Sequence, residues 1–311
     1  MASLINRNSE GVFIIAATPF SDQGVLDFDS TNRLIDFYLD SGVSGITILG
    51  IMGEAPKLDQ AESIQFARAV MQRVNSRIPV VVGVSGAGLG NLSTLAATVM
   101  DMGAAGVMVS PLQGLNTEVK LFDYYTEVSR ALGQHVPICL QDYPQASGVH
   151  ISVDTILSIT AQLPQVVMLK HEDWPGLGKL ARVRHESNTD RVPRISILTG
   201  NGGLFLPQEL HRGADGAMTG FAYPEMLVNV VAMHKAGRVD EAEDLFDKYL
   251  PLVRYEQQPG FGLAVRKEIL RRRGVIQSAA VRAPGPRLSA EDHAELSRLI
   301  TRLEYKLEGG H

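Results

Sequence analysis

The chain has 311 residues, of which 45% are hydrophobic and 20% are charged, and its formal net charge is −5. This balance is typical of a globular protein with a large core, and without a basic stretch we expect no binding to nucleic acid or to anionic membranes. Cys139 is the only cysteine, which excludes a disulfide within the chain and argues against a cysteine-based zinc site. With neither an apolar signal segment nor an apolar run of 18 residues, we expect a soluble, cytoplasmic protein.

Short apolar runs alternate with amphipathic stretches over the first 220 residues. The eight runs are Val12–Ala17, Gly45–Gly50, Pro79–Val84, Gly106–Pro111, Pro137–Tyr143, Val166–Glu172, Arg194–Gly200 and Gly216–Gly220. Helical periodicity lies between them, as at Thr31–Ser41, Asp59–Asn75, Leu92–Met102 and Thr117–Leu132. A spacing of about 30 residues per unit is that of a βα repeat. Eight such units predict an α/β fold of the (β/α)8 barrel type, with a doubly wound parallel sheet as the alternative.

Only helical patterns follow Gly220. They are Glu225–Ala236, Val239–Val253, Phe261–Arg273 and Ser289–Glu308, and a loop rich in proline and glycine at Val281–Leu288 precedes the last of them. We therefore expect a barrel that carries the active site over residues 1–222 and a C-terminal helical region over residues 223–311.

Lys170 stands out because it follows the apolar residues 166–169 in one predicted strand. Lysine is rarely fully buried without a partner, and burial disfavours its charged ammonium form. A neutral amine in a fixed position is what nucleophilic attack on a carbonyl requires. The alternative is a lysine at a strand end whose ammonium reaches water.

The alternation of side chains along a strand places several polar groups on one face. Lys170 and Glu172 share a face, whereas His171 points to the other side, toward the helices. Gln141 and Tyr143 likewise share a face at the end of the fifth run. Because barrel enzymes carry their chemistry at the C-terminal ends of the strands, these groups are expected around one opening.

Several short motifs in a fixed order resemble one family along nearly the whole chain. They are Thr18-Pro19-Phe20, Gly50-Ile51-Met52-Gly53-Glu54, Gly83 through Thr94, Asp142-Tyr143-Pro144 with Gly148, Lys170, Gly200-Asn201-Gly202 and Gly213 through Gly220. In this order and spacing they resemble the dihydrodipicolinate synthase / N-acetylneuraminate lyase family of Schiff-base aldolases.

The resemblance implies a (β/α)8 barrel with a helical C-terminal region, assembled as a homotetramer (a dimer of dimers). It also implies a small-molecule 2-oxo acid substrate, often pyruvate, bound to Lys170 as an imine. A protonated imine accepts the electron pair of a carbanion at C3, which permits carbon–carbon cleavage, carbon–carbon formation or loss of a C4 hydroxyl. We expect no cofactor, and no metal, because the eight histidines lack metal-ligand spacing.

The sequence departs from the family pattern at the positions that carry its proton relay. Ile51 and Met52 stand where two threonines are usual, and Gln141 stands at the catalytic tyrosine. An amide cannot act as a general acid or base near neutral pH. Ala146 replaces the arginine of the synthases, and the tyrosine expected after Pro111 is absent. We therefore regard 4-hydroxy-tetrahydrodipicolinate synthase activity as the least favoured of three interpretations.

One branch of the family, the 2-keto-3-deoxy-L-arabonate dehydratases, is more similar. The similar segments are Leu140-Gln141-Asp142, Ala146-Ser147-Gly148, Lys170-x-Glu172 with Lys179-Leu180, and Gly216 through Gly220 with Tyr223-Pro224. The form Gly50-x-x-Gly53-Glu54 is not usual in that branch, so the sugar acid and the choice between dehydratase and aldolase stay open.

The resemblance and the alternation together give roles to the polar residues. Lys170 is the expected imine former, and Glu172 is the expected general acid and base, with a simple countercharge for Lys170 as the alternative. Gln141 is either a hydrogen-bond partner of the substrate or a structural amide. Tyr143 is either a pocket wall or a substitute phenol.

The remaining expected site residues come from loops at the barrel mouth. Gly50, Ile51 and Met52 are expected to bind substrate through the loop backbone, because glycines let a backbone approach a ligand closely. Asn201 and Thr219 are further candidates for the pocket lining, whereas Glu54 is expected to hold its loop in place.

The favoured hypothesis is thus a Schiff-base lyase, either a dehydratase or an aldolase, that acts on a 2-oxo acid such as a 2-keto-3-deoxy sugar acid. The alternative is a non-catalytic 2-oxo-acid sensor on the same barrel, which the loss of the hydroxyl relay suggests.

Overall fold

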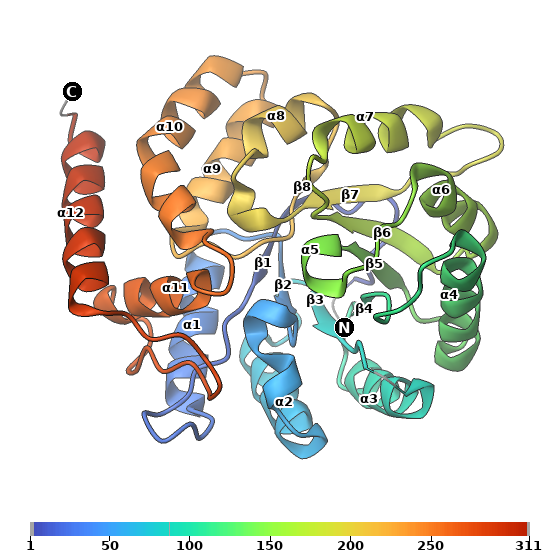
Figure 1. The fold of residues 1–311 in the computed structure, drawn as a ribbon, viewed down its shortest axis with the longest axis horizontal. Coiled ribbons are helices and arrows are strands. Elements are labelled where there is room, and N and C mark those ends of the chain that lie inside the picture. The colour runs from blue at the N-terminus through green and yellow to red at the C-terminus, as the bar shows by residue number, and fades with distance from the viewer. Residues whose placement is uncertain (1–2, 87, 310–311) are drawn as a thin grey trace.

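Eight parallel strands pair in chain order and close into a barrel in the computed structural model, which describes residues 3–86 and 88–309 (Figure 1). The strands are β1 (Gly11–Ile15), β2 (Gly45–Ile48), β3 (Val80–Gly83), β4 (Gly106–Val109), β5 (Ile138–Asp142), β6 (Val166–His171), β7 (Ser196–Thr199) and β8 (Gly216–Ala217). Seven lie wholly within the predicted runs and β1 begins one residue earlier. The predicted (β/α)8 barrel is confirmed, and the doubly wound sheet was the wrong alternative.

Helices between the strands form the outer layer (Figure 1). They are α1 (Phe28–Asp40), α2 (Gln60–Val74), α3 (Leu89–Asp101), α4 (Glu118–Leu132), α5 (Pro144–Ser147), α6 (Val153–Gln162), α7 (Leu177–Glu186) and α8 (Leu206–His211). Short 3-10 turns at Ile51–Gly53, Ala55–Lys57 and Asn201–Gly203 complete the loops after β2 and β7. In residues 3–86 and 88–309, every helix is too short or too polar to cross a membrane.

Apolar side chains fill the barrel interior below the strand ends. The buried cluster comprises Ile5, Phe13, Ile15, Val81, Ala105, Met108, Cys139, Met168, Leu198 and Met218. Ile5 closes the floor, where its amide donates to the carbonyl of Ala105 at 2.9 Å. Because the interior is packed rather than open, polar chemistry is confined to the opposite, C-terminal end.

The C-terminal helices are α9 (Pro224–Lys235), α10 (Val239–Glu256), α11 (Gly262–Arg272) and α12 (Ala290–Leu307). Helix α9 packs against β1 and β8, so it takes the place of the eighth barrel helix. Helix α10 packs against α9, α11 and α12, and α12 lies at the edge of the molecule (Figure 1). The division of the chain at residue 222 stays a prediction.

Candidate active site

An amine, a carboxylate and an amide meet at the C-terminal ends of β5 and β6. The Nζ atom of Lys170 lies 2.9 Å from Oε2 of Glu172, and Nε2 of Gln141 donates to the same oxygen at 2.8 Å. Gln141 pairs with Lys170 in the register of β5 and β6. All three side chains are buried. The shared face that the alternation of the strands predicted thus brings these groups into direct contact.

Backbone contacts beyond the end of β6 fix the position of Glu172. Its amide donates to the carbonyl of Asp142 at 2.9 Å, and Nδ2 of Asn201 donates to its carbonyl at 3.0 Å. Gly200 leaves room for the side chain, because a Cβ there would lie 2.2 Å from Cγ of Glu172. The backbone of Glu172 is therefore held from the end of β5 and from the loop after β7, and its side chain occupies the space that Gly200 leaves.

His171 points away from the mouth, as predicted. Its Nδ1 lies 3.4 Å from Oδ2 of Asp142, and Nζ of Lys179 lies 2.6 Å from the same oxygen. Glu209 of α8 is also buried in this outer layer, and burial raises its pKa to about 7, while the nearby His171 acts in the opposite direction. These groups surround the outer side of β6 and are separated from the Lys170–Glu172 pair by the strand itself.

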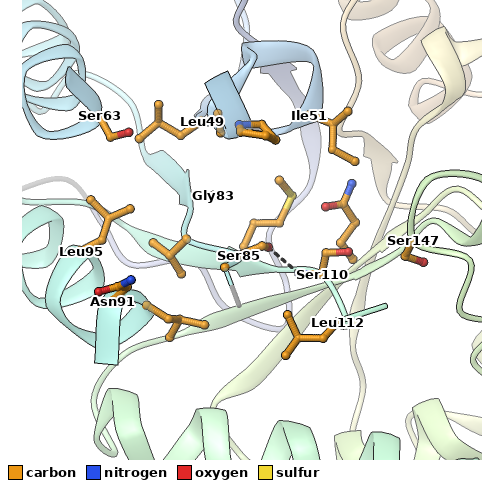
Figure 2. Close-up of a pocket in the computed structure, with 18 of the residues that line it drawn as sticks. Leu49, Ile51, Ser63, Gly83, Ser85, Asn91, Leu95, Ser110, Leu112 and Ser147 are labelled. Carbon is orange, nitrogen blue, oxygen red and sulfur yellow. Dashed lines mark hydrogen bonds between the residues drawn. The ribbon is translucent and has the colours of Figure 1, made fainter. Parts of the chain in front are cut away.

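A cavity of about 540 Å³ opens beside the three-residue cluster, over the ends of β2, β3, β4 and β5 (Figure 2). Gln141 lines it and so connects it to Glu172. In Figure 2, Ser63 and Asn91 lie on one side and Ser147 on the other, while the amide of Ser110 donates to Oγ of Ser85 at 2.8 Å. The polar lining side chains are Gln60, Ser63, Ser85, Asn91, Ser110, Gln113, Gln141 and Ser147. Within the described part of the chain, every lining residue is uncharged.

The loop after β2 contributes two of the predicted residues to this cavity. Gly50 and Ile51 line it, whereas Met52 packs against the apolar barrel interior. The turn closes through a hydrogen bond from the amide of Gly53 to the carbonyl of Gly50 at 3.0 Å. The amides of Ile51 and Met52 donate to no other group in the described residues.

The other three candidates, Tyr143, Asn201 and Thr219, are not among the residues that line this cavity. Tyr143 is half-buried, and burial raises its pKa, with the charge of Glu172 acting in the same direction. Asn201 binds the carbonyl of Glu172, and Oγ1 of Thr219 accepts from the amide of Gly202 at 2.7 Å. Asn201 therefore supports the backbone of Glu172, and Thr219 supports the turn after β7.

Sequence reasoning missed most of the hydroxyl and amide side chains of the cavity. Ser63 and Asn91 belong to α2 and α3, and Ser85 and Ser110 lie just past β3 and β4. Position after a strand is the only signal that could have found the two serines. Gly200 was noted as part of a motif, but the sequence does not show that its missing Cβ makes room for Glu172.

The described residues near the cavity do not favour metal binding or thiol chemistry. Across 3–86 and 88–309, no three His, Cys, Asp or Glu side chains are grouped closely enough to hold a metal ion. Cys139 lies below Gln141 in the barrel interior, where burial raises the pKa of its thiol to about 12. The ionisable groups in contact with one another beside Gln141 are the amine of Lys170 and the carboxylate of Glu172.

A comparison with known proteins places this arrangement in a family. The profile of the dihydrodipicolinate synthetase family matches residues 8–303. The chain belongs to this family. It is 30% identical over 308 residues to an L-2-keto-3-deoxyarabonate dehydratase from Azospirillum brasilense, covering 98% of this chain and 97% of that one. It is 28% identical over 292 residues to a 4-hydroxy-tetrahydrodipicolinate synthase from Cellvibrio japonicus, covering 92% and 96%. Relatives with such names are lyases, and this chain is a lyase of the family.

Solved structures agree with this assignment. A crystal structure described as dihydrodipicolinate synthase from Rhodopseudomonas palustris has a TM-score of 0.94 and 46% identity, covering 97% of this chain and all of that one. A prophage protein of the family from Escherichia coli, solved in complex with pyruvate, has a TM-score of 0.85 and 25% identity, covering 95% and 98%. Both names describe those proteins, and the substrate of the present chain has to be argued from its own site.

Replacing Gly200 with alanine should push the carboxylate of Glu172 away from Lys170. The φ of Gly200 is −109°, so the clash with Glu172, rather than a left-handed backbone, carries the effect. We expect the free energy of unfolding to fall by about 1–3 kcal/mol in chemical denaturation, as for other overpacked sites. A crystal structure of the variant should show the Lys170–Glu172 contact broken.

Gly178→Ala is the matched control, because a Cβ there meets no atom within 4 Å. Because Gly178 lies in α7, alanine there should raise the free energy of unfolding by up to about 1 kcal/mol and should leave the contact between Lys170 and Glu172 intact. An intact contact in the Gly200→Ala crystal would contradict the role given to Gly200.

Proposed function

We propose that the protein is a Schiff-base lyase that acts on a 2-keto-3-deoxy sugar acid through an imine on Lys170. The observation that carries the proposal is the buried pair of Lys170 and Glu172, 2.9 Å apart at the end of β6. An amine can form an imine only after it loses a proton, and Glu172 lies within direct reach to accept it. The family membership and the pyruvate complex of a relative support the same chemistry.

The proposed reaction begins with the attack of the neutral Lys170 amine on the C2 carbonyl. The hydroxyl of the resulting carbinolamine takes the proton back from Glu172 and leaves as water, and a protonated imine forms that withdraws electrons from C3. Glu172 then removes a proton from C3, and the electron pair of that C–H bond forms the C2–C3 double bond of an enamine. In a dehydratase the enamine expels the C4 hydroxyl, which takes a proton from Glu172 and departs as water.

The same residues also serve a retro-aldol reaction. Glu172 would then take the proton of the C4 hydroxyl, the C3–C4 bond would break, and an aldehyde would leave. The remaining enamine would regain a proton at C3 and be hydrolysed to pyruvate and free Lys170. Gln141 suits either outcome, because its amide holds Oε2 of Glu172 but does not itself transfer protons.

The loop after β2 is the proposed site of the substrate carboxylate. The amides of Ile51 and Met52 are available as donors, and the loop lines the cavity beside Gln141. Convergent backbone amides can bind an anion without a cationic side chain. Without the two threonine hydroxyls that are usual in the family, the substrate carboxylate would thus make fewer hydrogen bonds, but it could still bind at this loop.

The uncharged cavity favours a substrate whose far end, away from the C1 carboxylate and the C2 carbonyl, is neutral and hydroxylated rather than charged. A second carboxylate or an ammonium group would lose its hydration there without gaining an opposite charge. Ala146 lines the cavity at the position where the synthases of the family carry an arginine. Serine, asparagine and glutamine side chains can instead exchange hydrogen bonds with the hydroxyls of a sugar acid. These features disfavour the synthase interpretation.

Borohydride trapping tests the proposed covalent step. With pyruvate present, reduction should add the mass of the reduced adduct to the peptide that contains Lys170, and Lys170→Ala should abolish this adduct. Glu172→Gln should still form the adduct, since Lys170 remains. It should slow the exchange of the C3 hydrogens of pyruvate with heavy water by about 10²–10⁴-fold, because the proton acceptor is lost.

Two results would contradict these roles. An adduct that is absent across several 2-oxo acids, or that forms on another lysine, would refute the imine on Lys170. Unchanged hydrogen exchange in the folded Glu172→Gln variant would reduce Glu172 to a countercharge.

A panel of substrates tests which 2-oxo acids the enzyme accepts and whether it dehydrates them or cleaves a carbon–carbon bond. We expect turnover of 2-keto-3-deoxy sugar acids of five or six carbons, assayed in parallel for pyruvate release and for the dehydrated 2-oxo product. Pyruvate with aspartate semialdehyde should give no comparable turnover. Thermal stabilisation by 2-oxo acids without turnover of any compound would instead support the sensor interpretation.

We also propose the homotetrameric state of the family, organised as a dimer of dimers, and a cytoplasmic location. Trp174 and Phe205 are 40% and 41% exposed, with ring centroids 5.7 Å apart, so the chain has an apolar surface suited to contact with another copy. Sedimentation velocity at micromolar concentration should show a tetramer, and a monomer would contradict it. Cell fractionation checks the location.

A further inference from the structure

Glu54 carries a buried charge directly after the loop that lines the cavity. The residue is 2% exposed and has a φ of 56°, in the left-handed region that non-glycine residues rarely adopt. The sequence predicted that Glu54 holds its loop in place, and its observed contacts support that prediction. They also identify the partners of the Glu54 carboxylate, which the sequence did not predict.

The carboxylate of Glu54 joins the loop after β2 to two distant parts of the chain. Its Oε1 lies 2.5 Å from Nζ of Lys267 in α11, and Oε2 accepts from the amide of Arg282 at 2.9 Å and from Nζ of Lys57 at 3.0 Å. Lys267 is fully buried and also donates to the carbonyl of Ala280 at 2.8 Å. Residues 278–282, here named the C-terminal strap, thus cross the outer end of this loop.

Arg282 fastens the strap to the start of α2. Its guanidinium makes two hydrogen bonds of 2.7 Å to Glu62 and one of 2.9 Å to the carbonyl of Lys57. In Figure 1 the loop between α11 and α12 lies over α1, and α1 packs against α2. The strap therefore contacts this segment at Glu54, at Lys57 and at Glu62.

The Thr18-Pro19-Phe20 motif also contacts the turn and two of the residues around it. The hydroxyl of Thr18 donates to the carbonyl of Gly53 at 2.5 Å. Nζ of Lys267 and Cζ of Arg282 lie 4.6 Å and 4.4 Å from the ring centroid of Phe20, within cation–π range. Two family motifs and the C-terminal region thereby converge on one short turn.

The barrel does not need this arrangement for its closure, which the pairing of β1 with β8 provides. Burying Glu54 and Lys267 requires the removal of water from both charges, and a buried pair is weak evidence for a gain in stability. Its stronger effect is on geometry, since each buried charge allows only positions in which its partner stays in contact.

We propose that Glu54, Lys267 and Arg282 are positioning residues that hold the turn of Gly50 to Gly53 in the conformation that receives the substrate carboxylate. The proposal rests on the proposed function for the carboxylate site. It makes the C-terminal strap, more than 200 residues away in the chain, a part of the substrate-binding apparatus. The three residues act through the backbone of the turn and do not touch the substrate.

Two variants and a control test the strap. Lys267→Met removes the buried cation, and Arg282→Ala removes the side-chain contacts of a partly exposed residue, so the second remains informative if the first does not fold. Arg184→Met is the control, because Arg184 pairs with Asp215 at the start of β8, at the opposite end of the barrel. Each variant is examined by hydrogen–deuterium exchange and by pyruvate-dependent borohydride trapping.

In Lys267→Met, the peptide covering residues 49–58 should exchange about tenfold faster, because loss of a charge-assisted contact loosens the turn. The pyruvate concentration for half-maximal trapping should rise by roughly tenfold, while the maximal trapping rate stays within about twofold. Arg282→Ala should change both quantities in the same direction. Arg184→Met should lower the melting temperature but leave exchange in 49–58 and half-maximal trapping unchanged.

Folded Lys267→Met and Arg282→Ala variants with wild-type exchange in 49–58 would overturn the strap as the support of the turn. Faster exchange with unchanged half-maximal trapping would overturn its role in substrate positioning. If the wild-type protein forms no adduct with any 2-oxo acid, the proposed function fails, and with it the positioning role. The exchange data would then still show whether the strap holds the turn.

Discussion

The structure depends on one constraint, which is that an amine and a carboxylate share a buried site at the end of β6. Lys170 and Glu172 are each at most 6% exposed and lie above an apolar barrel interior. Neither charge could be buried there alone, because desolvation strongly disfavours an isolated ion. Their contact makes the site stable at rest, and the proton that one must give to the other is the first step that imine chemistry requires.

The surrounding residues hold Lys170 and Glu172 in contact and leave one side of the pair open to a cavity. Gln141 holds the carboxylate, Asn201 holds the backbone behind it, and Gly200 provides the space that it occupies. On the open side lies a cavity with hydroxyl and amide side chains and no charged lining residue among those described. Charge is thus concentrated at the Lys170–Glu172 pair, and under the proposed function the rest of the substrate meets neutral hydrogen-bonding groups.

The sequence predicted the elements whose periodicity is strict. Eight apolar runs gave the strands, and the alternation along β6 correctly separated Lys170 and Glu172 from His171. It could not predict the cavity, because Ser63 and Asn91 come from helices whose approach to the mouth depends on loop geometry. It likewise could not show that Met52 packs against the barrel interior or that Asn201 binds the carbonyl of Glu172, since turns have no side-chain period. The contact of Glu54 with Lys267 spans 213 residues, and no local pattern encodes it.

A crystal structure of the protein reduced with borohydride in the presence of pyruvate tests the central claim most directly. The account predicts continuous electron density from Nζ of Lys170 to C2 of the ligand. The ligand carboxylate should lie on the amides of Ile51 and Met52, and the carboxylate of Glu172 should face C3. Density that ends at an unmodified Lys170, with the ligand bound elsewhere or attached to another lysine, would contradict it.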